Sequence, residues 1–292
     1  TSIALALISG FALGAAILAF SRGLLELMGC PENVIEGAAL YLKIYAAGLP
    51  ASMIYNFGAA ILRAVGDTRR PLYFLTVSGI VIINVLLVAG LKLSVAGVAI
   101  ATVASEVLSC VLVLLCLIHS HDAIRYEPKK TRIYKKSLSM ILRIGLPAGL
   151  QSSMFSISNV LIQSAINSFG AAAIAGNTAA ASIEGFATTL SNALSQAALT
   201  FSSQNMGAGK YARVRRVLAV CLAATLIGGL CMGLLIVTFG TPLLALFNTD
   251  PDVIACGLIR VSHNMPPYFL FCLQDTFVGL LRGIGYSLLP TI

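Results

Sequence analysis

The stretch LRAVGDTRRP, residues 62–71, decides how this sequence folds, because part of it occurs twice. Its Leu, Arg, Gly and Pro recur 219 positions later in LRGIGYSLLP, residues 281–290. The register also holds upstream, where glycine again meets glycine, as in the pair Gly10 and Gly229. No gap is needed across about 70 residues, and a match of that length indicates a duplicated half.

The composition indicates a membrane protein. Of the 292 residues, 58% are hydrophobic and only 10% are charged, whereas soluble domains carry about 25% charged residues. The net charge of +8 comes from short clusters between apolar stretches. That pattern excludes a nucleic-acid groove, in which basic and aromatic residues share one face. The seven cysteines form no CxxC pair, so we expect apolar packing residues and no metal site or cofactor. A long duplication in such a chain is typical of two-lobed transporters.

Eight stretches are long and apolar enough to predict membrane-spanning helices, each of which needs about 20 apolar residues. The predicted fold is therefore an all-α polytopic membrane protein with about eight transmembrane helices. The stretches run near residues 2–28, 36–61, 72–91, 95–118, 138–167, 171–203, 216–247 and 254–284.

The loops between these stretches alternate in charge. The loops at 67–70, 119–136 and 207–216 are basic, and the positive-inside rule therefore predicts that they are cytoplasmic. Arg63 and Arg282 then both lie at cytoplasmic helix ends with six spans between them. An even number of spans makes the repeat parallel, with its pseudo-two-fold axis along the membrane normal.

This arrangement predicts an N-terminal lobe over residues 1–118, a cytoplasmic linker over 119–136 and a C-terminal lobe over 137–292. The sequence does not begin with Met and carries no signal peptide. Completing both copies of the repeat would give roughly 420 residues. We therefore expect the chain to be the middle part of a longer protein.

Three motifs in order carry a family resemblance. YLKIYAAGLP with AAILRAVGDTRRPL (residues 41–72), AGVAIATVASE (96–106) and FSSQNMGAGKYARVRR (201–216) together resemble the multidrug and toxic compound extrusion (MATE) family, closest to its DNA-damage-inducible branch. The resemblance implies twelve helices in two six-helix lobes, of which this chain would be helices three to ten.

The resemblance further implies a secondary active antiporter rather than an enzyme. Such a protein exports small amphipathic organic cations in exchange for Na⁺ or H⁺ by alternating access. We expect a monomer in the inner (plasma) membrane, in contact with lipid. Two alternatives stay open: a lipid-linked saccharide flippase of the same superfamily, and a non-transporting membrane scaffold or receptor. Carboxylates within the spans argue against a scaffold, which gains nothing from their insertion cost.

Two carboxylates are the strongest candidates for a substrate or coupling-ion site, since a charge at the bilayer centre costs about 3 kcal/mol. Glu184 lies mid-span, with Asn177 seven residues earlier on the same helix face. Asp275 lies on one face with Arg282, and the repeat maps it onto Asn56. The alternative for Asp275 is an ion pair or hydrogen bond that locks its lobe.

Glu106 is a third candidate, either functional or a polar contact between helices. The resemblance suggests an ion site on its helix five and helix six, where Asn84 and Thr102 match. Position 88 is Val, so the family's second acid is missing there. On helix seven, where the resemblance implies an acid in sodium-driven members, the matching stretch has none, and Gln151 is its polar residue.

Helix ends and prolines complete the candidates. Arg63 and Arg282 close their helices, either as cations at helix C-termini or as gating residues. Pro50 and the pair Pro266-Pro267 are expected to break their spans at equivalent depths, and Pro267 is a candidate for bending during transport. Glu26 is expected to pair with Arg22 at i,i+4.

Overall fold

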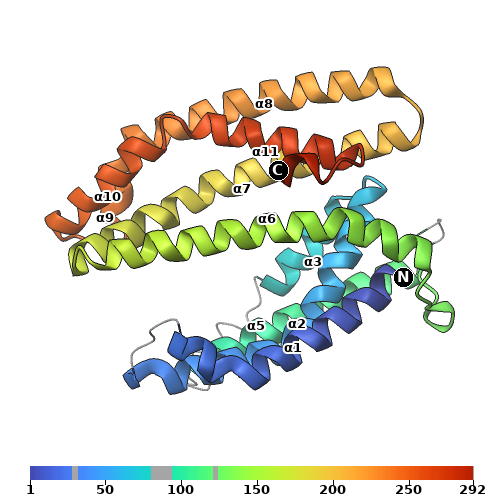
Figure 1. Ribbon diagram of the computed structural model, residues 1–292, viewed down its shortest axis with the longest axis horizontal. Coiled ribbons are helices and arrows are strands. Elements are labelled where there is room, and N and C mark those ends of the chain that lie inside the picture. The colour runs from blue at the N-terminus through green and yellow to red at the C-terminus, as the bar shows by residue number, and fades with distance from the viewer. Residues whose placement is uncertain (28–31, 80–93, 121–123, 292) are drawn as a thin grey trace. The chain divides into compact units, whose positions relative to one another are not determined.

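The computed structural model describes residues 1–27, 32–79, 94–120 and 124–291, and these residues are all-helical (Figure 1). They form ten α-helices and two 3₁₀ turns. The helices are α1 (Ser2–Leu27), α2 (Glu32–Ala64), α3 (Arg69–Gly79), α5 (Ser94–Ile118), α6 (Lys135–Asn167), α7 (Ala171–Gly207), α8 (Tyr211–Thr238), α9 (Gly240–Ala245), α10 (Pro251–Asn264) and α11 (Tyr268–Gly283). The 3₁₀ turns are η1 (Pro128–Lys130) and η2 (Leu289–Thr291).

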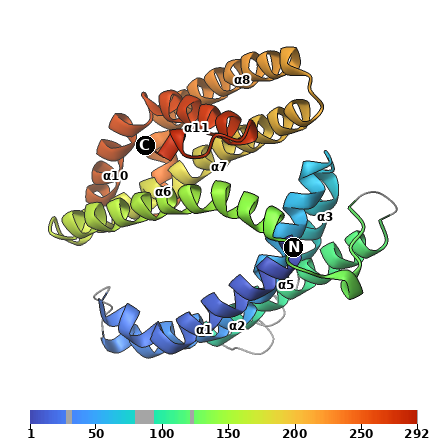
Figure 2. The same cartoon turned by 45° about the vertical axis from the view of Figure 1, so that its right-hand side comes forward.

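The chain divides into two compact units, unit 1 (Thr1–Ser139) and unit 2 (Met140–Ile292). In unit 1, α2 packs along both α1 and α5, which Figures 1 and 2 show from two sides. In unit 2, α11 packs along α7 and α8, and α10 packs along α7. A cluster of small and branched apolar residues from α7 to α10 forms the largest core of unit 2.

Glycines let the helices of each unit approach closely. A Cβ on Gly10 of α1 would lie 2.6 Å from the Pro50 Cα, and one on Gly14 would lie 2.8 Å from the Ala46 carbonyl oxygen. Small residues at helix contacts are typical of membrane bundles, where backbone packing replaces the hydrophobic effect.

The same contacts recur in unit 2, 219 residues later. There a Cβ on Gly229 would lie 3.0 Å from the Phe269 Cα, and one on Gly233 would lie 2.7 Å from the Met265 carbonyl oxygen. Positions 10, 14, 46 and 50 plus 219 are positions 229, 233, 265 and 269. The sequence repeat is therefore also a repeat of helix–helix contacts.

The repeated LRxxG stretch is a helix C-cap in both units. Gly66 donates its N–H to the Arg63 carbonyl, and Asp67 donates to the Leu62 carbonyl. In the same pattern, Gly285 donates its N–H to the Arg282 carbonyl, and Tyr286 donates to the Leu281 carbonyl. This double bond pattern is a Schellman motif, which requires a left-handed residue after the helix. Gly66 and Gly285 have φ of 89° and 97°, which explains why glycine recurs there.

Two of the predicted spans are each divided into two helices. The stretch at 216–247 is divided between α8 and α9 at Phe239, and that at 254–284 is divided between α10 and α11 over residues 265–267. The latter break was expected, because consecutive prolines remove two backbone donors.

The prediction that Pro50 breaks its helix was wrong. Pro50 lies inside the continuous α2, and α1 packs its Gly10 directly against that turn. Close backbone packing of this kind supports a proline turn inside a membrane helix.

Four of the described helices contain segments long and apolar enough to cross a membrane: Ser2–Gly23, Ile35–Ala64, Ala96–Ile118 and Tyr211–Thr238. Large apolar side chains such as Phe11, Phe20 and Leu234 are exposed along them. The expected spans at 138–167 and 171–203 are helical but more polar. The expected span at 254–284 is divided between α10 and α11, each of which is shorter than 18 residues. The expected span at 72–91 lies partly outside the described residues. The expected count of eight is therefore met in part by this measure.

We predict that replacing Gly10 with Val destabilises unit 1, because the new Cβ meets backbone atoms that cannot move aside. Overpacking of this kind costs about 1–3 kcal/mol. Gly23→Val, on the same helix with no atom within 4 Å of its Cβ, is the matched control. Thermal unfolding of both variants in detergent measures the difference, and equal midpoints would contradict the packing described.

Candidate functional site

One face of α7 carries a row of polar side chains toward α10 and α11. Its members recur at spacings of three, four and seven residues, which keeps them on one helix face. They are Asn177, Glu184, Thr188, Ser191 and Ser195. Because apolar helices leave few partners for polar groups, this row fixes which residues of α10 and α11 it meets.

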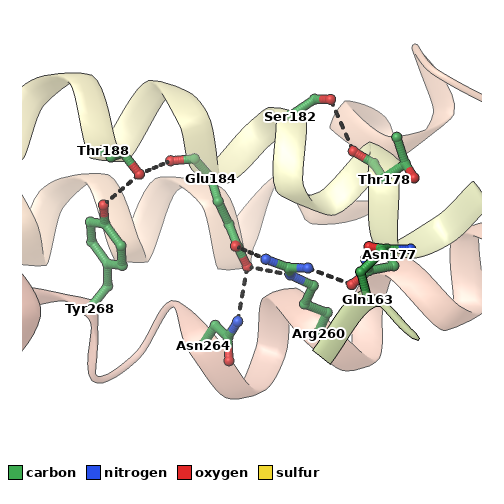
Figure 3. Close-up of polar contacts among 9 residues, drawn as sticks. All are labelled: Gln163, Asn177, Thr178, Ser182, Glu184, Thr188, Arg260, Asn264 and Tyr268. Carbon is green, nitrogen blue, oxygen red and sulfur yellow. Dashed lines mark hydrogen bonds and ion pairs between the residues drawn. The ribbon is translucent and has the colours of Figure 1, made fainter. Parts of the chain in front are cut away.

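Glu184 is neutralised by Arg260 of α10 (Figure 3). The Arg260 Nε donates to Oε1 at 3.0 Å, and Nη2 donates to Oε2 at 2.6 Å. Asn264, one turn further along α10, donates its amide to Oε1 at 3.1 Å. The paired side chains are 13% exposed for Glu184 and 29% for Arg260. Three charge-assisted or polar donors therefore occupy the carboxylate.

Arg260 also joins the other predicted residue of this face. Its Nη1 donates to the Asn177 Oδ1, and Asn177 in turn donates to Gln163 of α6 at 3.0 Å. Figure 3 shows the guanidinium between Glu184 and Asn177. Further along α7, Tyr268 donates to Thr188 at 3.0 Å. This cluster, Gln163–Asn177–Arg260–Glu184–Asn264, ties together three helices of unit 2.

Arg260 was missed by the sequence analysis, which considered arginines only at helix ends. A signal for it exists. An arginine in an apolar span carries the same insertion cost as a glutamate, so two such charges of opposite sign in one lobe are expected to pair.

Asp275 of α11 has a different environment. Its Oδ2 accepts a hydrogen bond from Ser191 at 3.1 Å, and its backbone carbonyl accepts one from Ser195 at 2.8 Å. Its side chain lines a cavity of about 240 Å³ in unit 2, together with Gln151 of α6 and Arg282. No ion pair joins Asp275 to a cation among the described residues, although Arg282 is near enough to act on its charge.

Arg282 and Gln151 meet in the same cavity. The Arg282 Nη2 donates to the Gln151 Oε1 at 2.6 Å, and Gln151 donates to the Pro290 carbonyl at 3.1 Å. Within the described part of the chain, the buried Nε of Arg282 has no partner. Three predicted residues, Gln151, Asp275 and Arg282, are thus brought together.

Unit 1 holds a second polar cavity, of about 250 Å³, which contains two more predicted residues, Asn56 of α2 and Glu106 of α5. Thr102, one turn before Glu106, instead bonds the Val98 carbonyl at 2.9 Å. Asn84 lies outside the described residues. Arg63 lies in the last turn of α2, and the described residues contain no cluster of three side chains able to hold a metal ion.

These features define the class of protein: a polytopic helical membrane protein with polar cavities lined by carboxylates. A family model described as MatE matches residues 1–89 and 147–292. The chain therefore belongs to the MatE family of multi-pass membrane transporters, not of enzymes, and its relatives include the multidrug export protein MepA of Staphylococcus aureus.

Relatives and solved structures agree with this membership. The chain is 28% identical over 94% of its length to the probable multidrug resistance protein YoeA of Bacillus subtilis, and 28% identical over 80% to the FAD transporter of Shewanella oneidensis. It spans 61% and 53% of those two proteins. The bent form of the Vibrio cholerae MATE transporter VcmN, 20% identical, has the same fold over 99% of this chain and 66% of its own, with a TM-score of 0.86.

We predict that Arg260→Gln destabilises unit 2, because it leaves the Glu184 carboxylate buried without its charge partner. Breaking a buried pair costs about 3–5 kcal/mol, and the partial exposure of Arg260 favours the lower end. The exposed pair Arg22–Glu26, confirmed at 3.0 Å, provides the control Arg22→Gln, with an expected cost below about 1 kcal/mol.

Chemical unfolding of both variants measures these costs. The double variant Arg260→Gln with Glu184→Gln should lose less than the sum of its single changes, since neither partner is then left charged. Strict additivity would show that the two side chains do not interact.

Proposed function

We propose that the full-length protein is a secondary active antiporter that exports organic cations in exchange for Na⁺ or H⁺ by alternating access. The observation that carries this proposal is the Asp275 cavity. It places an acidic group, without a paired cation among the described residues, in a polar pocket of a MatE-family chain. An unpaired carboxylate in such a pocket attracts either a coupling ion or a cationic substrate.

The two lobes proposed from the repeat are like-oriented bundles of common descent, over residues 1–118 and 137–292. Equivalent glycine contacts and equivalent C-caps at an offset of 219 residues support this duplication. Two related bundles facing one another are the usual basis of alternating access.

The proposed roles of the two main carboxylates differ. Asp275 is the coupling or substrate residue, with Gln151 and Arg282 beside it in the cavity. Glu184 is a positioning residue, because Arg260 and Asn264 already occupy both of its oxygens. A carboxylate held in this way has little freedom to exchange its partner for a passing cation.

An alternative cargo is favoured by one relative and by one feature of the cavity. The Shewanella oneidensis relative is named an FAD transporter, and FAD carries phosphates. Arg282, whose buried Nε is unpartnered within the described residues, supplies a cation that could meet such a group. The cargo test therefore includes an anionic probe.

We predict that vesicles containing the full-length protein export a fluorescent organic cation when a sodium or a pH gradient is imposed alone. Asp275→Asn should lower the initial rate of export at least about tenfold, which corresponds to a rise of ~1.4 kcal/mol in the activation free energy. Asp252→Asn, an exposed carboxylate in the first turn of α10, should leave it unchanged.

The outcomes separate the proposals. Normal export by Asp275→Asn under both gradients would remove Asp275 from the mechanism. Wild-type vesicles that export FAD but no organic cation would favour the anionic cargo, and vesicles that export neither would count against the antiporter.

We predict that Pro267→Ala reduces bending between α10 and α11 and slows export several-fold, since Ala restores a donor at the break. Pro50→Ala, inside the continuous α2, is the comparison and should have the smaller effect. Spin-label distances between α10 and α11, measured with and without substrate, report the bending. An unchanged distance distribution in Pro267→Ala would exclude this hinge.

A further inference from the structure

The loop that follows α5 is strongly basic. Six of the thirteen residues from 124 to 136 are Lys or Arg, and one, Glu127, is acidic. The cations are Arg125, Lys129, Lys130, Arg132, Lys135 and Lys136. The positive-inside rule predicts that this loop is cytoplasmic, but that rule requires only the presence of the charges. It does not account for the defined structure that the loop adopts.

The first part of the loop is folded back onto the helix ends of unit 1. The Tyr126 N–H donates to the carbonyl of Leu117, in the last turn of α5, at 2.9 Å. Tyr126 and Ile124 also pack against a buried apolar cluster that α1, α2 and α5 form together. These contacts attach the loop to the bundle at a fixed place.

The later part of the loop is attached to the start of α1. The Thr1 hydroxyl donates to the Arg132 carbonyl at 3.1 Å, and the Tyr134 N–H donates to the same hydroxyl at 3.1 Å. Between the two attachments, the hydroxyls of Tyr126 and Thr131 hydrogen-bond to each other at 2.9 Å. The segment between Tyr126 and Arg132 is therefore held at both ends.

A cavity of about 290 Å³ lies between this segment and the helix ends, and we call it the linker cavity. Its apolar lining comes mainly from the helices, with Ile3 of α1, Ile61 of α2 and Leu117 of α5. Its charged lining comes from the loop and includes Arg125 and Lys130. All three helices contain candidate membrane spans that begin or end here. The linker cavity is thus amphipathic and lies at the end of the membrane-spanning segments.

The two cations of the linker cavity are available to an anion. Arg125 forms no ion pair with another described residue. Lys130 pairs with Glu127 at 2.8 Å, but the two side chains are 77% and 47% exposed. An ion pair as exposed as this one is weak, so Lys130 can exchange Glu127 for another anion at little cost.

This combination of groups fits a phosphate that is attached to an apolar molecule. Lys and Arg donate charge-assisted hydrogen bonds to phosphate oxygens, and basic pockets at the cytoplasmic ends of membrane helices bind anionic lipid head groups. Free phosphate would use the cations but gain nothing from the apolar lining, whereas a lipid uses both. Small-molecule sites have volumes of about 300–1,000 Å³, so the linker cavity suits a head group rather than a whole lipid.

We propose that the linker cavity binds the phosphate head group of an anionic phospholipid, such as phosphatidylglycerol, from the cytoplasmic leaflet. The bound lipid holds the basic loop against the helix ends of unit 1. This inference concerns neither the cargo nor the coupling ion, and it does not depend on the proposed antiporter function.

The test uses the purified full-length protein in detergent. Phosphatidylglycerol or phosphatidylcholine with the same acyl chains is added, and native mass spectrometry counts the lipids bound per chain. We expect at least one bound phosphatidylglycerol that an equal concentration of phosphatidylcholine does not replace. Arg125→Gln combined with Lys130→Gln should weaken this binding at least about tenfold, because both cations of the cavity are lost.

The matched control removes the same amount of charge from the same loop. Lys135→Gln combined with Lys136→Gln changes two cations that do not line the linker cavity, and should leave the affinity for phosphatidylglycerol nearly unchanged. Equal weakening by the two double variants would show a general attraction of lipid to the basic loop and would overturn the site.

Two further variants guard against misfolding. Arg125→Lys combined with Lys130→Arg keeps both charges and should retain the binding of phosphatidylglycerol. Glu127→Gln removes the carboxylate that competes for Lys130 and should tighten it, a gain that a misfolded protein cannot produce. Weaker binding by Glu127→Gln would contradict the proposed position of the phosphate.

The source of the phosphate is tested in the same experiment. Inorganic phosphate that binds as tightly as phosphatidylglycerol would identify a free-anion site, and equal binding of the two lipids would show that the head-group charge is not recognised. Either result overturns the inference. Because no transport is measured, failure of wild-type vesicles to export a cation would count against the antiporter and leave the lipid site standing.

Discussion

An ionised group inside a bundle of apolar helices must be compensated, and the way in which each one is compensated determines what it can do. Burial in a low-dielectric environment costs several kcal/mol per ion unless a partner charge or polar groups repay it. Glu184 meets this requirement with Arg260. Asp275 and Glu106 meet it in part, through hydroxyl groups and a cavity. The first arrangement fixes two helices together, and the second leaves an acid without a paired cation among the described residues.

Close backbone approach makes these arrangements possible. The Gly229 contact brings α8 and α11 close enough for threonine hydroxyls to reach across, in the buried bond between Thr225 and Thr276 at 2.8 Å. Larger residues at the glycine positions would separate the helices and leave those hydroxyls without partners. Small-residue packing and polar pairing are therefore coupled between α8 and α11 of unit 2.

Much of the fold could be predicted from the sequence, because its signals are local. Apolar runs predicted helices, and the recurring LRxxG predicted equivalent helix ends, which the two Schellman caps explain. The break at residues 265–267 was predicted from consecutive prolines. Pro50 was misread because a proline's effect depends on what packs against its turn. Here that neighbour is Gly10, which is forty residues away in the sequence.

The candidate site could be predicted only as far as single-helix geometry reaches. Spacing placed Asn177 with Glu184, and Asp275 with Arg282, because each pair shares one helix face. The partner Arg260, which comes from another helix, could not be assigned without the packing of α10 on α7. The pairing of Gln151 with Arg282 was missed for the same reason, since it joins α6 to α11.

The comparison of Asn56 with Asp275 shows why a repeat constrains a cavity more strongly than it constrains a residue. A charge within a shared space acts on that space from any side of it, because Coulomb energy depends on distance and not on the helix of origin. In unit 1 the neutral Asn56 lines the same cavity as the acidic Glu106. A second acid in the same cavity would add like-charge repulsion to the cost of burying the first, and each of the two cavities has a single carboxylate in its lining.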